Sequence, residues 1–468
     1  MDETKSFYPH KKITTTSILV RVRGTTEKIV ILGGGSPFVP SLIYAMIENK
    51  DVLDGSELCL MDIDPTRLPL LVKLGQVLTK KAKMRMRFTY TTDPREALEG
   101  ATYVMPSYRV GGVKHMRFDF DIPTKYGICG DETAGPGGTF MAQCTIPVTI
   151  NYCRMIEDLC PDAWVISYVN PTNFVADAVR RETKTKFIAI CDCFAGFAMR
   201  ALPVWLNMPP FERRYCVNED IKPRAIGVNH NTWLVDLLVN GEDGYPLLKK
   251  SLEKYKRYEE SPAASQGPSI FALRLLDIYG YLNVCPYHCH MYWEHDKAMK
   301  IRKGRPEESI LGWSESAWNF VKEMVDGADY DPNRPEYCFH LHHARHAVGI
   351  MVSIIADEGR EWGGINFPNN GAIGNLPQGS IVEGPCIVDK RGITPITVGD
   401  LPKPFLGLTL HMINWQELTV DAALSGDKNV LYQALLACPY VHDMEAAKKI
   451  MDELLAAHAE YMPQFKRG

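Results

Sequence analysis

The stretch Lys28-Ile-Val-Ile-Leu-Gly-Gly-Gly-Ser36 decides the fold of this chain. Its apolar, mostly β-branched residues are typical of a buried strand, and the glycines that follow allow the backbone to turn sharply into a helix. At such a turn the free backbone N–H groups and the helix dipole favour a pyrophosphate. Gly33, Gly35 and Ser36 are therefore predicted to bind a dinucleotide cofactor.

Short apolar strands continue to alternate with helical patterns further along the chain. The predicted strands are Ile29–Leu32, Glu57–Met61, Tyr103–Met105, Trp164–Tyr168 and Phe187–Ile190. The segments between them, such as Pro40–Glu48 and Thr66–Lys80, carry apolar residues at helical spacing. This alternation predicts a parallel sheet with helices on both faces, as in Rossmann-like domains.

The alternation loosens after about residue 200, where Ser261–Pro268 is rich in proline and serine and Asp443–Met462 has the pattern of a long amphipathic helix. We expect an N-terminal extension over residues 1–26 and a Rossmann-like NAD-binding domain over residues 27–200. Residues 201–468 are expected to form a mixed α+β domain that serves substrate, metal and subunit contacts. The predicted fold class is α/β, with the parallel sheet in the N-terminal half.

Composition restricts the kind of partner. Charged residues make up 23% of the chain and the net charge is −4, so no basic surface for nucleic acid or anionic membrane is indicated. No apolar run reaches the length of a membrane span, and the N-terminal residues lack the apolar core of a signal peptide. The 13 cysteines lack the spacing of a disulfide framework. We expect a cytoplasmic enzyme with reduced thiols that acts on a small molecule.

Asp62 is the predicted contact for the cofactor ribose. It directly follows the predicted strand Glu57–Met61, at the position where a carboxylate hydrogen-bonds a ribose diol. Phe38 occupies the third glycine position of the usual GxGxxG pattern, so the glycine motif alone does not identify the cofactor. An acid at position 62 would repel a 2′-phosphate, which favours NAD over NADP.

A thiol and an imidazole form the candidate metal site. Cys191 and His230 are too far apart for a local zinc motif, but each follows a predicted strand or turn at the same end of the sheet. Such a pair leaves coordination positions open, as a catalytic metal site requires. Taken singly, each residue is more often a buried cysteine or a capping histidine. The neighbouring Asn170, Asp192 and Asn229 favour the metal site.

The order of these blocks resembles glycoside hydrolase family 4, whose members cleave sugars with NAD and manganese instead of two carboxylates. The resemblance covers roughly residues 28–462. Further blocks that carry it are Arg109-Val-Gly-Gly112, Ile122-Pro123, the stretch Gly130-Asp-Glu-Thr-Ala-Gly-Pro-Gly-Gly138, Asn369-Asn-Gly371, Leu376-Pro377 and Val382-Glu383. Two positions depart from the common pattern, namely the Cys191-Asp-Cys-Phe194 tetrapeptide and Asp131, where glutamine is common. The sugar and the aglycone therefore stay open.

The resemblance implies roles for single residues. Cys191 and His230 would bind Mn²⁺, and Asp192 would be the general acid toward an α-linked leaving group. The residues expected to bind the sugar are Asn170, Arg109 and Asn229.

The catalytic base is expected in the aromatic segment Tyr279–Tyr292, which resembles the corresponding family segment with one residue deleted. Tyr287 is the first candidate and Tyr292 the second. His288, Cys289 and His290 also suggest a second metal cluster. We set that cluster aside because alternation along an extended segment would place neighbours on opposite faces.

The resemblance implies a glycosidase that acts by elimination. NAD transiently oxidises C3 of the sugar, a base removes the C2 proton, the leaving group departs, water adds and hydride returns. The main alternative is an NAD-dependent dehydrogenase of a sugar or 2-hydroxy acid, which needs no Cys/His pair. A sensor that kept the fold would have lost the ligands. We also expect a homodimer or homotetramer.

Overall fold

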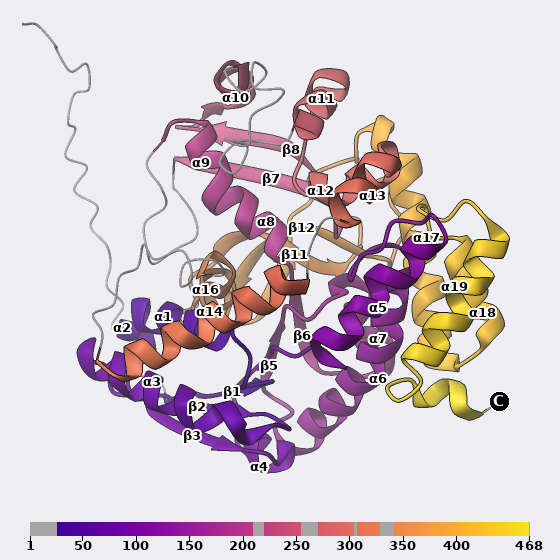
Figure 1. Cartoon of the computed structure of the whole chain (residues 1–468). Coiled ribbons are helices and arrows are strands. Elements are labelled where there is room, and N and C mark those ends of the chain that lie inside the picture. The colour runs from indigo at the N-terminus through magenta and orange to yellow at the C-terminus, as the bar shows by residue number, and fades with distance from the viewer. Residues whose placement is uncertain (1–25, 209–219, 254–269, 304–306, 328–340, 468) are drawn as a thin grey trace, which may run out of the picture.

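The protein is organised around one continuous sheet (Figure 1). The computed structural model describes the chain in five stretches. The described residues are 26–208, 220–253, 270–303, 307–327 and 341–467. The predicted extension, up to residue 25, and the segment Ser261–Pro268 lie outside them. Within the described residues, no helix is both long and apolar enough to cross a membrane.

The first part of the sheet is parallel, as predicted. Its strands are β1 (Lys28–Leu32), β2 (Glu57–Met61), β3 (Arg87–Thr91), β4 (Tyr103–Pro106), β5 (Trp164–Ser167) and β6 (Lys186–Ile190). They lie in the order β3-β2-β1-β4-β5-β6, with every neighbouring pair parallel. The sequence did not predict β3, because this edge strand buries only Phe88 and so lacks an apolar run.

Helices cover both faces of this parallel part. They are α1 (Val39–Glu48), α2 (Lys50–Leu53), α3 (Leu68–Lys81), α4 (Pro94–Leu98), α5 (Gly112–Lys125), α6 (Gly135–Leu159) and α7 (Thr172–Glu182). Figure 1 shows α1 and α3 on one side of the strands and α5, α6 and α7 on the other. Strand β1 is buried from both sides, since Ile29, Val30 and Ile31 have no exposed surface. The strand that precedes the glycine turn is therefore fixed in the core.

The sheet continues past β6 with antiparallel strands from the second half of the chain. They are β7 (Ile221–Val228), β8 (Asn231–Val239), β9 (Glu242–Asp243), β10 (Leu282–Asn283), β11 (Arg360–Pro368), β12 (Ile381–Asp389) and β13 (Gly392–Pro395). Strand β11 pairs with β6, and β12, β7, β8 and β10 follow in that order. One 13-stranded sheet thus spans both halves. The predicted boundary after residue 200 falls inside the π-helical turn η2 (Phe197–Ala201), between α8 (Asp192–Gly196) and α9 (Leu202–Trp205).

Some of the remaining helices pack around the antiparallel part, and others pack against helices of the first half, for example α14 (Glu307–Val325) against α3. They are α10 (Tyr245–Leu252), α11 (Ile270–Tyr279), α12 (Pro286–Trp293), α13 (His295–Lys303), α14 (Glu307–Val325), α16 (Leu341–Ile355), α17 (Lys403–Ser425), α18 (Lys428–Leu436) and α19 (Met444–Ala457). The C-terminal helices lie beside α5, α6 and α7 in Figure 1. Buried hydrogen bonds join α17 to them, for example Asn173 Nδ2 to Gln416 Oε1 at 2.7 Å. The helix predicted over Asp443–Met462 ends at Ala457, and Asp443 caps its start by accepting from the Ala446 N–H.

Candidate active site

The glycine turn and Asp62 meet at the carboxyl ends of β1 and β2. Gly33 has a φ of +88°, and a Cβ there would lie 2.4 Å from the Ser107 carbonyl oxygen, so only glycine fits. The Gly35 N–H donates to Asp62 Oδ2 at 2.8 Å. The Ser36 N–H donates to the Gly33 carbonyl at 3.0 Å and closes the turn that leads into α1. The structure therefore brings all four predicted cofactor residues together.

Cys191 and His230 also meet, although 39 residues separate them. Cys191 follows β6 directly and precedes α8, and His230 lies in the tight turn between β7 and β8 with a φ of +69°. Their Sγ and Nε2 atoms are 3.4 Å apart, and both side chains are buried. The pKa of Cys191 is raised well above its usual range, mainly by a hydrogen bond with Cys193 and secondly by burial. The pKa of His230 is lowered mainly by burial and secondly by the nearby charge of His288, so its ring is neutral at neutral pH and offers a lone pair.

Glu383 on β12 holds the turn that presents His230. Its buried carboxylate accepts from Asn229 Nδ2 at 2.7 Å, Thr232 Oγ1 at 3.0 Å and Asn366 Nδ2 at 3.4 Å. Burial raises the pKa of Glu383. Asn229, a predicted sugar ligand, therefore uses its amide nitrogen within the protein, and its buried Oδ1 has no hydrogen-bond partner among the described residues. Glu383 belongs to a block that resembles the family, but the sequence does not indicate that its carboxylate holds the turn at His230.

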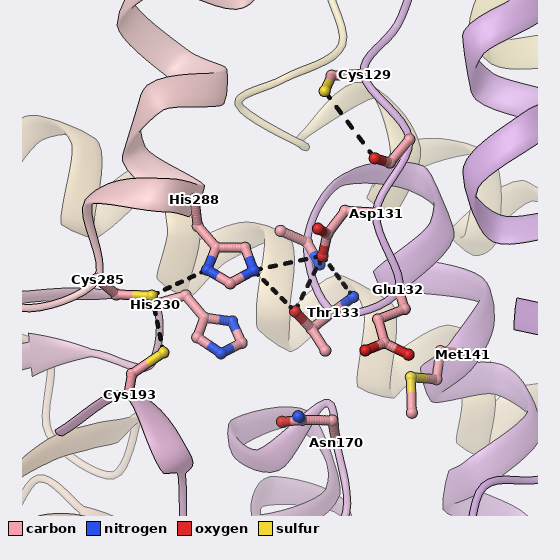
Figure 2. A network of polar contacts seen from close by, with 12 residues as sticks. Cys129, Asp131, Glu132, Thr133, Met141, Asn170, Cys193, His230, Cys285 and His288 are labelled. Carbon is pink, nitrogen blue, oxygen red and sulfur yellow. Dashed lines mark hydrogen bonds and ion pairs between the residues drawn. The ribbon is translucent and has the colours of Figure 1, made fainter. Parts of the chain in front are cut away.

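Two further thiols and a second imidazole surround His230 (Figure 2). Ligand atoms of Cys193, His230, Cys285 and His288 all lie within 4.8 Å of one another, and we call these residues the four-donor cluster. The Cys193 and Cys285 sulfurs are 2.8 Å apart, and Cys285 Sγ is 2.9 Å from His288 Nδ1. The His230 and His288 rings stack with centroids 4.0 Å apart. Together with Cys191, the site is rich in sulfur.

The prediction of an extended segment around His288 was wrong, because Pro286–Trp293 forms the helix α12. Cys285 is the N-cap residue of α12 and His288 lies in its first turn, so both side chains point the same way. His290 points elsewhere and pairs with Glu294 at 2.9 Å, and the Cys289 thiol faces the His230 carbonyl at 3.6 Å. The Cys-x-x-His spacing and the proline at the helix start were the available signals.

Asp131 supports His288 from the opposite side. Nε2 of His288 lies 3.2 Å from Thr133 Oγ1 and 3.5 Å from Asp131 Oδ1 (Figure 2). Asp131 is buried, and its Oδ1 also accepts from the Thr133 and Ala134 N–H groups at the start of α6. A carboxylate behind an imidazole orients the ring, so that Nδ1, which faces Cys285 Sγ, is the nitrogen suited to bind a cation.

Asp192 pairs with histidines that the sequence analysis did not find. The carboxylate lies 2.6 Å from His342 Nε2 and 3.9 Å from His343 Nδ1, both at the start of α16. Burial lowers the pKa of His343 to about 4, so this ring is neutral at neutral pH. The His343 ring also lies 4.5 Å from the Tyr168 ring and 6.4 Å from that of Phe38, beside the glycine turn. No local pattern in the sequence links these histidines to position 192.

The predicted sugar ligands Arg109 and Asn170 differ in their hydrogen-bond partners. Arg109 donates to Asp119 Oδ2 at 2.5 Å and to Glu132 Oε2 at 2.6 Å, so two carboxylates already bind its guanidinium. Asn170 accepts from Thr172 Oγ1 at 2.9 Å, and Figure 2 shows its side chain below those of His230 and Thr133. A direct contact of either residue with a sugar stays a prediction.

The two candidate bases differ in position. The ring of Tyr287 packs edge-on against that of His288, with centroids 5.4 Å apart, and its hydroxyl oxygen is buried. Tyr292 is 37% exposed and packs against Trp293. Only Tyr287 therefore lies directly against the four-donor cluster.

A glycine turn suited to a dinucleotide and a cluster of side chains that could hold a metal ion lie at the ends of strands of one sheet, an arrangement typical of cofactor-dependent enzymes. The chain matches the model of the family 4 glycosyl hydrolases over residues 28–205 and that of their C-terminal domain over residues 225–441. The chain belongs to this family and is a glycosyl hydrolase.

Similar proteins cover nearly the whole chain. A Bacillus subtilis (strain 168) protein named "Probable 6-phospho-beta-glucosidase" is 30% identical and covers 94% of this chain and 98% of its own length. An alpha-galactosidase of the same strain is 28% identical and covers 94% of this chain and 100% of its own length. A 6-phospho-alpha-glucosidase from gut microorganisms, solved with NAD and glucose-6-phosphate, is 26% identical with a TM-score of 0.81, and the match covers 94% of this chain and 99% of that one. A second such structure, with NAD and Mn²⁺, is 23% identical with a TM-score of 0.82, at the same coverage.

Proposed function

We propose that this protein hydrolyses an α-linked glycoside with NAD and a divalent metal ion, by oxidation at C3 and elimination across C1 and C2. The observation that carries the proposal is the Cys191–His230 pair at 3.4 Å, with Asp192 next to it at the end of β6. The relatives are named both as phosphoglucosidases and as an alpha-galactosidase, so the proposal does not commit to a phosphorylated sugar.

The residues at the glycine turn fit NAD. A Cβ at Gly35 would lie 2.9 Å from Asp62 Oδ2, so glycine lets the carboxylate approach the turn where the ribose is expected. When bound, NAD supplies a reversible acceptor for the C3 hydride. Asp62 would accept hydrogen bonds from the ribose hydroxyls and repel a 2′-phosphate.

The donor atoms around His230 fit a divalent transition-metal ion, and a similar structure contains Mn²⁺. A thiol and a neutral imidazole within 3.4 Å are suitable ligands once the thiol loses its proton. When bound, the ion supplies a Lewis acid that makes the C2 proton easier to remove.

The protein's own groups would move the protons. Asp192 would give a proton to the departing oxygen, and its contact with His342 Nε2 at 2.6 Å would hold the carboxyl group in place. Tyr287 would take the C2 proton, because its ring packs against that of His288, next to the cluster where a cation would stabilise the phenolate. Asn170 would bind sugar hydroxyls. A cytoplasmic homodimer or homotetramer completes the proposal.

Turnover of a panel of nitrophenyl glycosides with NAD, Mn²⁺ and a reductant tests the function. NAD is expected to act in less than stoichiometric amount without accumulation of NADH. A chelator should abolish turnover and Mn²⁺ should restore it. NADH formed in step with substrate loss would support the dehydrogenase alternative instead, and full activity of Cys191→Ser without added metal would exclude the proposed metal role.

Exchange at C2 tests the elimination. Products formed in deuterated water should carry deuterium at C2, and Tyr287→Phe should suppress this exchange while NAD and metal still bind. Tyr292→Phe is the matched control. Exchange that is lost only in Tyr292→Phe would transfer the base role to Tyr292, and wild-type product without C2 deuterium would rule out elimination.

A further inference from the structure

We propose that Cys193, Cys285 and His288 are metal ligands, and that together with His230 of the pair implied by the family they bind one divalent ion through two thiolates and two imidazoles, with a fifth position left for a sugar oxygen. This inference deepens the proposed function, because it concerns the ligand set and the metal class of the same site. The binding itself does not depend on which glycoside is cleaved.

The distances between the donors suit one small ion. With metal–sulfur bonds of about 2.3 Å and metal–nitrogen bonds of about 2.0 Å, tetrahedral ligands lie about 3.3 to 3.8 Å apart. The measured separations bracket this range, from 2.8 Å between the two sulfurs to the 4.8 Å limit of the cluster. Modest side-chain rotations, including a turn of one imidazole out of the stack, would place all four donors around a common centre.

The surroundings of His288 provide an independent argument. Its Nδ1 faces the Cys285 sulfur, and its Nε2 faces Thr133 and the buried Asp131 carboxylate. Metal-binding histidines typically make such a contact through the nitrogen that does not bind the ion.

The donor types indicate the metal class. Thiolate and imidazole ligands suit zinc, cobalt and ferrous iron, whereas manganese prefers carboxylate, carbonyl and water oxygen. Cys191 lies 3.4 Å from His230 and adds a third sulfur at the edge of the cluster. We therefore expect this protein to bind thiophilic ions with more than one metal–sulfur bond, even if Mn²⁺ supports turnover.

The experiment is a Co²⁺ titration of the metal-free full-length protein under reducing, anaerobic conditions, read by absorbance. Each cobalt–thiolate bond contributes to a near-ultraviolet charge-transfer band. If two thiolates bind, Cys193→Ser and Cys285→Ser should each lower this band by about half. Cys289→Ser is the matched control, because its buried thiol lies on the same helix outside the cluster. Its band should equal that of wild type.

Two results would overturn the proposal. One is a full band in Cys193→Ser and Cys285→Ser together with a lost band in Cys191→Ser, which would restrict binding to the family pair. The other is a Cys193–Cys285 disulfide in the protein as purified, seen by mass measurement after alkylation without reductant.

If a serine variant fails to fold, the Asp131→Asn variant tests the proposal instead. It should weaken Co²⁺ binding by about 10- to 100-fold, and unchanged affinity would contradict the proposal. No substrate enters these measurements, so their failure and that of C2 exchange are distinguishable.

Discussion

Removing the Glu383 carboxylate should disturb the metal site without touching a metal ligand. Its two oxygens accept from Asn229, Thr232 and Asn366, and the first two flank His230 in the turn between β7 and β8. In Glu383→Ala the Asn229 amide loses its acceptor, whereas Thr232 Oγ1 keeps the Val228 carbonyl at 3.1 Å and Asn366 Nδ2 keeps the Ala189 carbonyl at 3.4 Å. Glu383→Gln can keep all three hydrogen bonds, because its Oε1 can accept from the two asparagines while its Nε2 donates to the Thr232 hydroxyl.

The magnitude follows from counting these donors. A buried donor left without an acceptor costs about 1 to 3 kcal/mol, so the loss of the Asn229 acceptor should lower the folding free energy of Glu383→Ala by about that amount, and water entering the space would reduce the cost. The turn would no longer hold His230 at its positive φ. Loss of such orienting contacts weakens metal binding by about 10- to 100-fold.

Calorimetric titration of the metal-free variants with Co²⁺, alongside thermal unfolding, measures both effects. We expect wild type and Glu383→Gln to bind alike and Glu383→Ala to bind more weakly and melt at a lower temperature. A folded Glu383→Ala variant with wild-type affinity would refute the reasoning. So would a Gln variant as impaired as the Ala variant, since the hydrogen-bond count predicts that they differ.

Three further outcomes follow from the site. Asp192→Asn should slow substrates with poor leaving groups by about 10²- to 10⁴-fold and nitrophenyl glycosides far less; equal losses would indicate that Asp192 only positions other groups. Gly35→Ala should weaken NAD binding in a calorimetric titration by about tenfold or more, because the new Cβ would lie 2.9 Å from Asp62 Oδ2, and an unchanged dissociation constant would contradict the cofactor assignment. Burial lowers the pKa of His343 to about 4, while the unfolded chain titrates near pH 6.5. Between these values only the unfolded chain binds the proton, so the stability present above about pH 6.5 should fall by about 1.4 kcal/mol per pH unit as pH drops toward 4; thermal unfolding of wild type and His343→Gln at pH 7 and 5 checks this, and an equal pH dependence in the two would speak against it.

The parallel half of the sheet could be predicted because its signals are local. Strand β1 and the glycines after it carry their own periodicity and turn chemistry, and Asp62 follows its strand at the expected distance. The prediction was less accurate where local patterns are weak. Strand β3 has one buried residue, and the short helix α12 has no clear apolar face, so it was taken as extended.

The sequence by itself determined the family, the cofactor turn and the presence of Cys191 and His230 in blocks that follow predicted strands. Only the tertiary structure decided that Cys193 and Cys285, 92 residues apart, lie side by side and that His342 pairs with Asp192. Only the structure showed that Arg109 is already bound by two carboxylates. The physical reason is that strand periodicity and turn chemistry act over a few neighbouring residues. Contacts between distant side chains depend on how β7, β8, β11 and β12 join the parallel strands in one sheet.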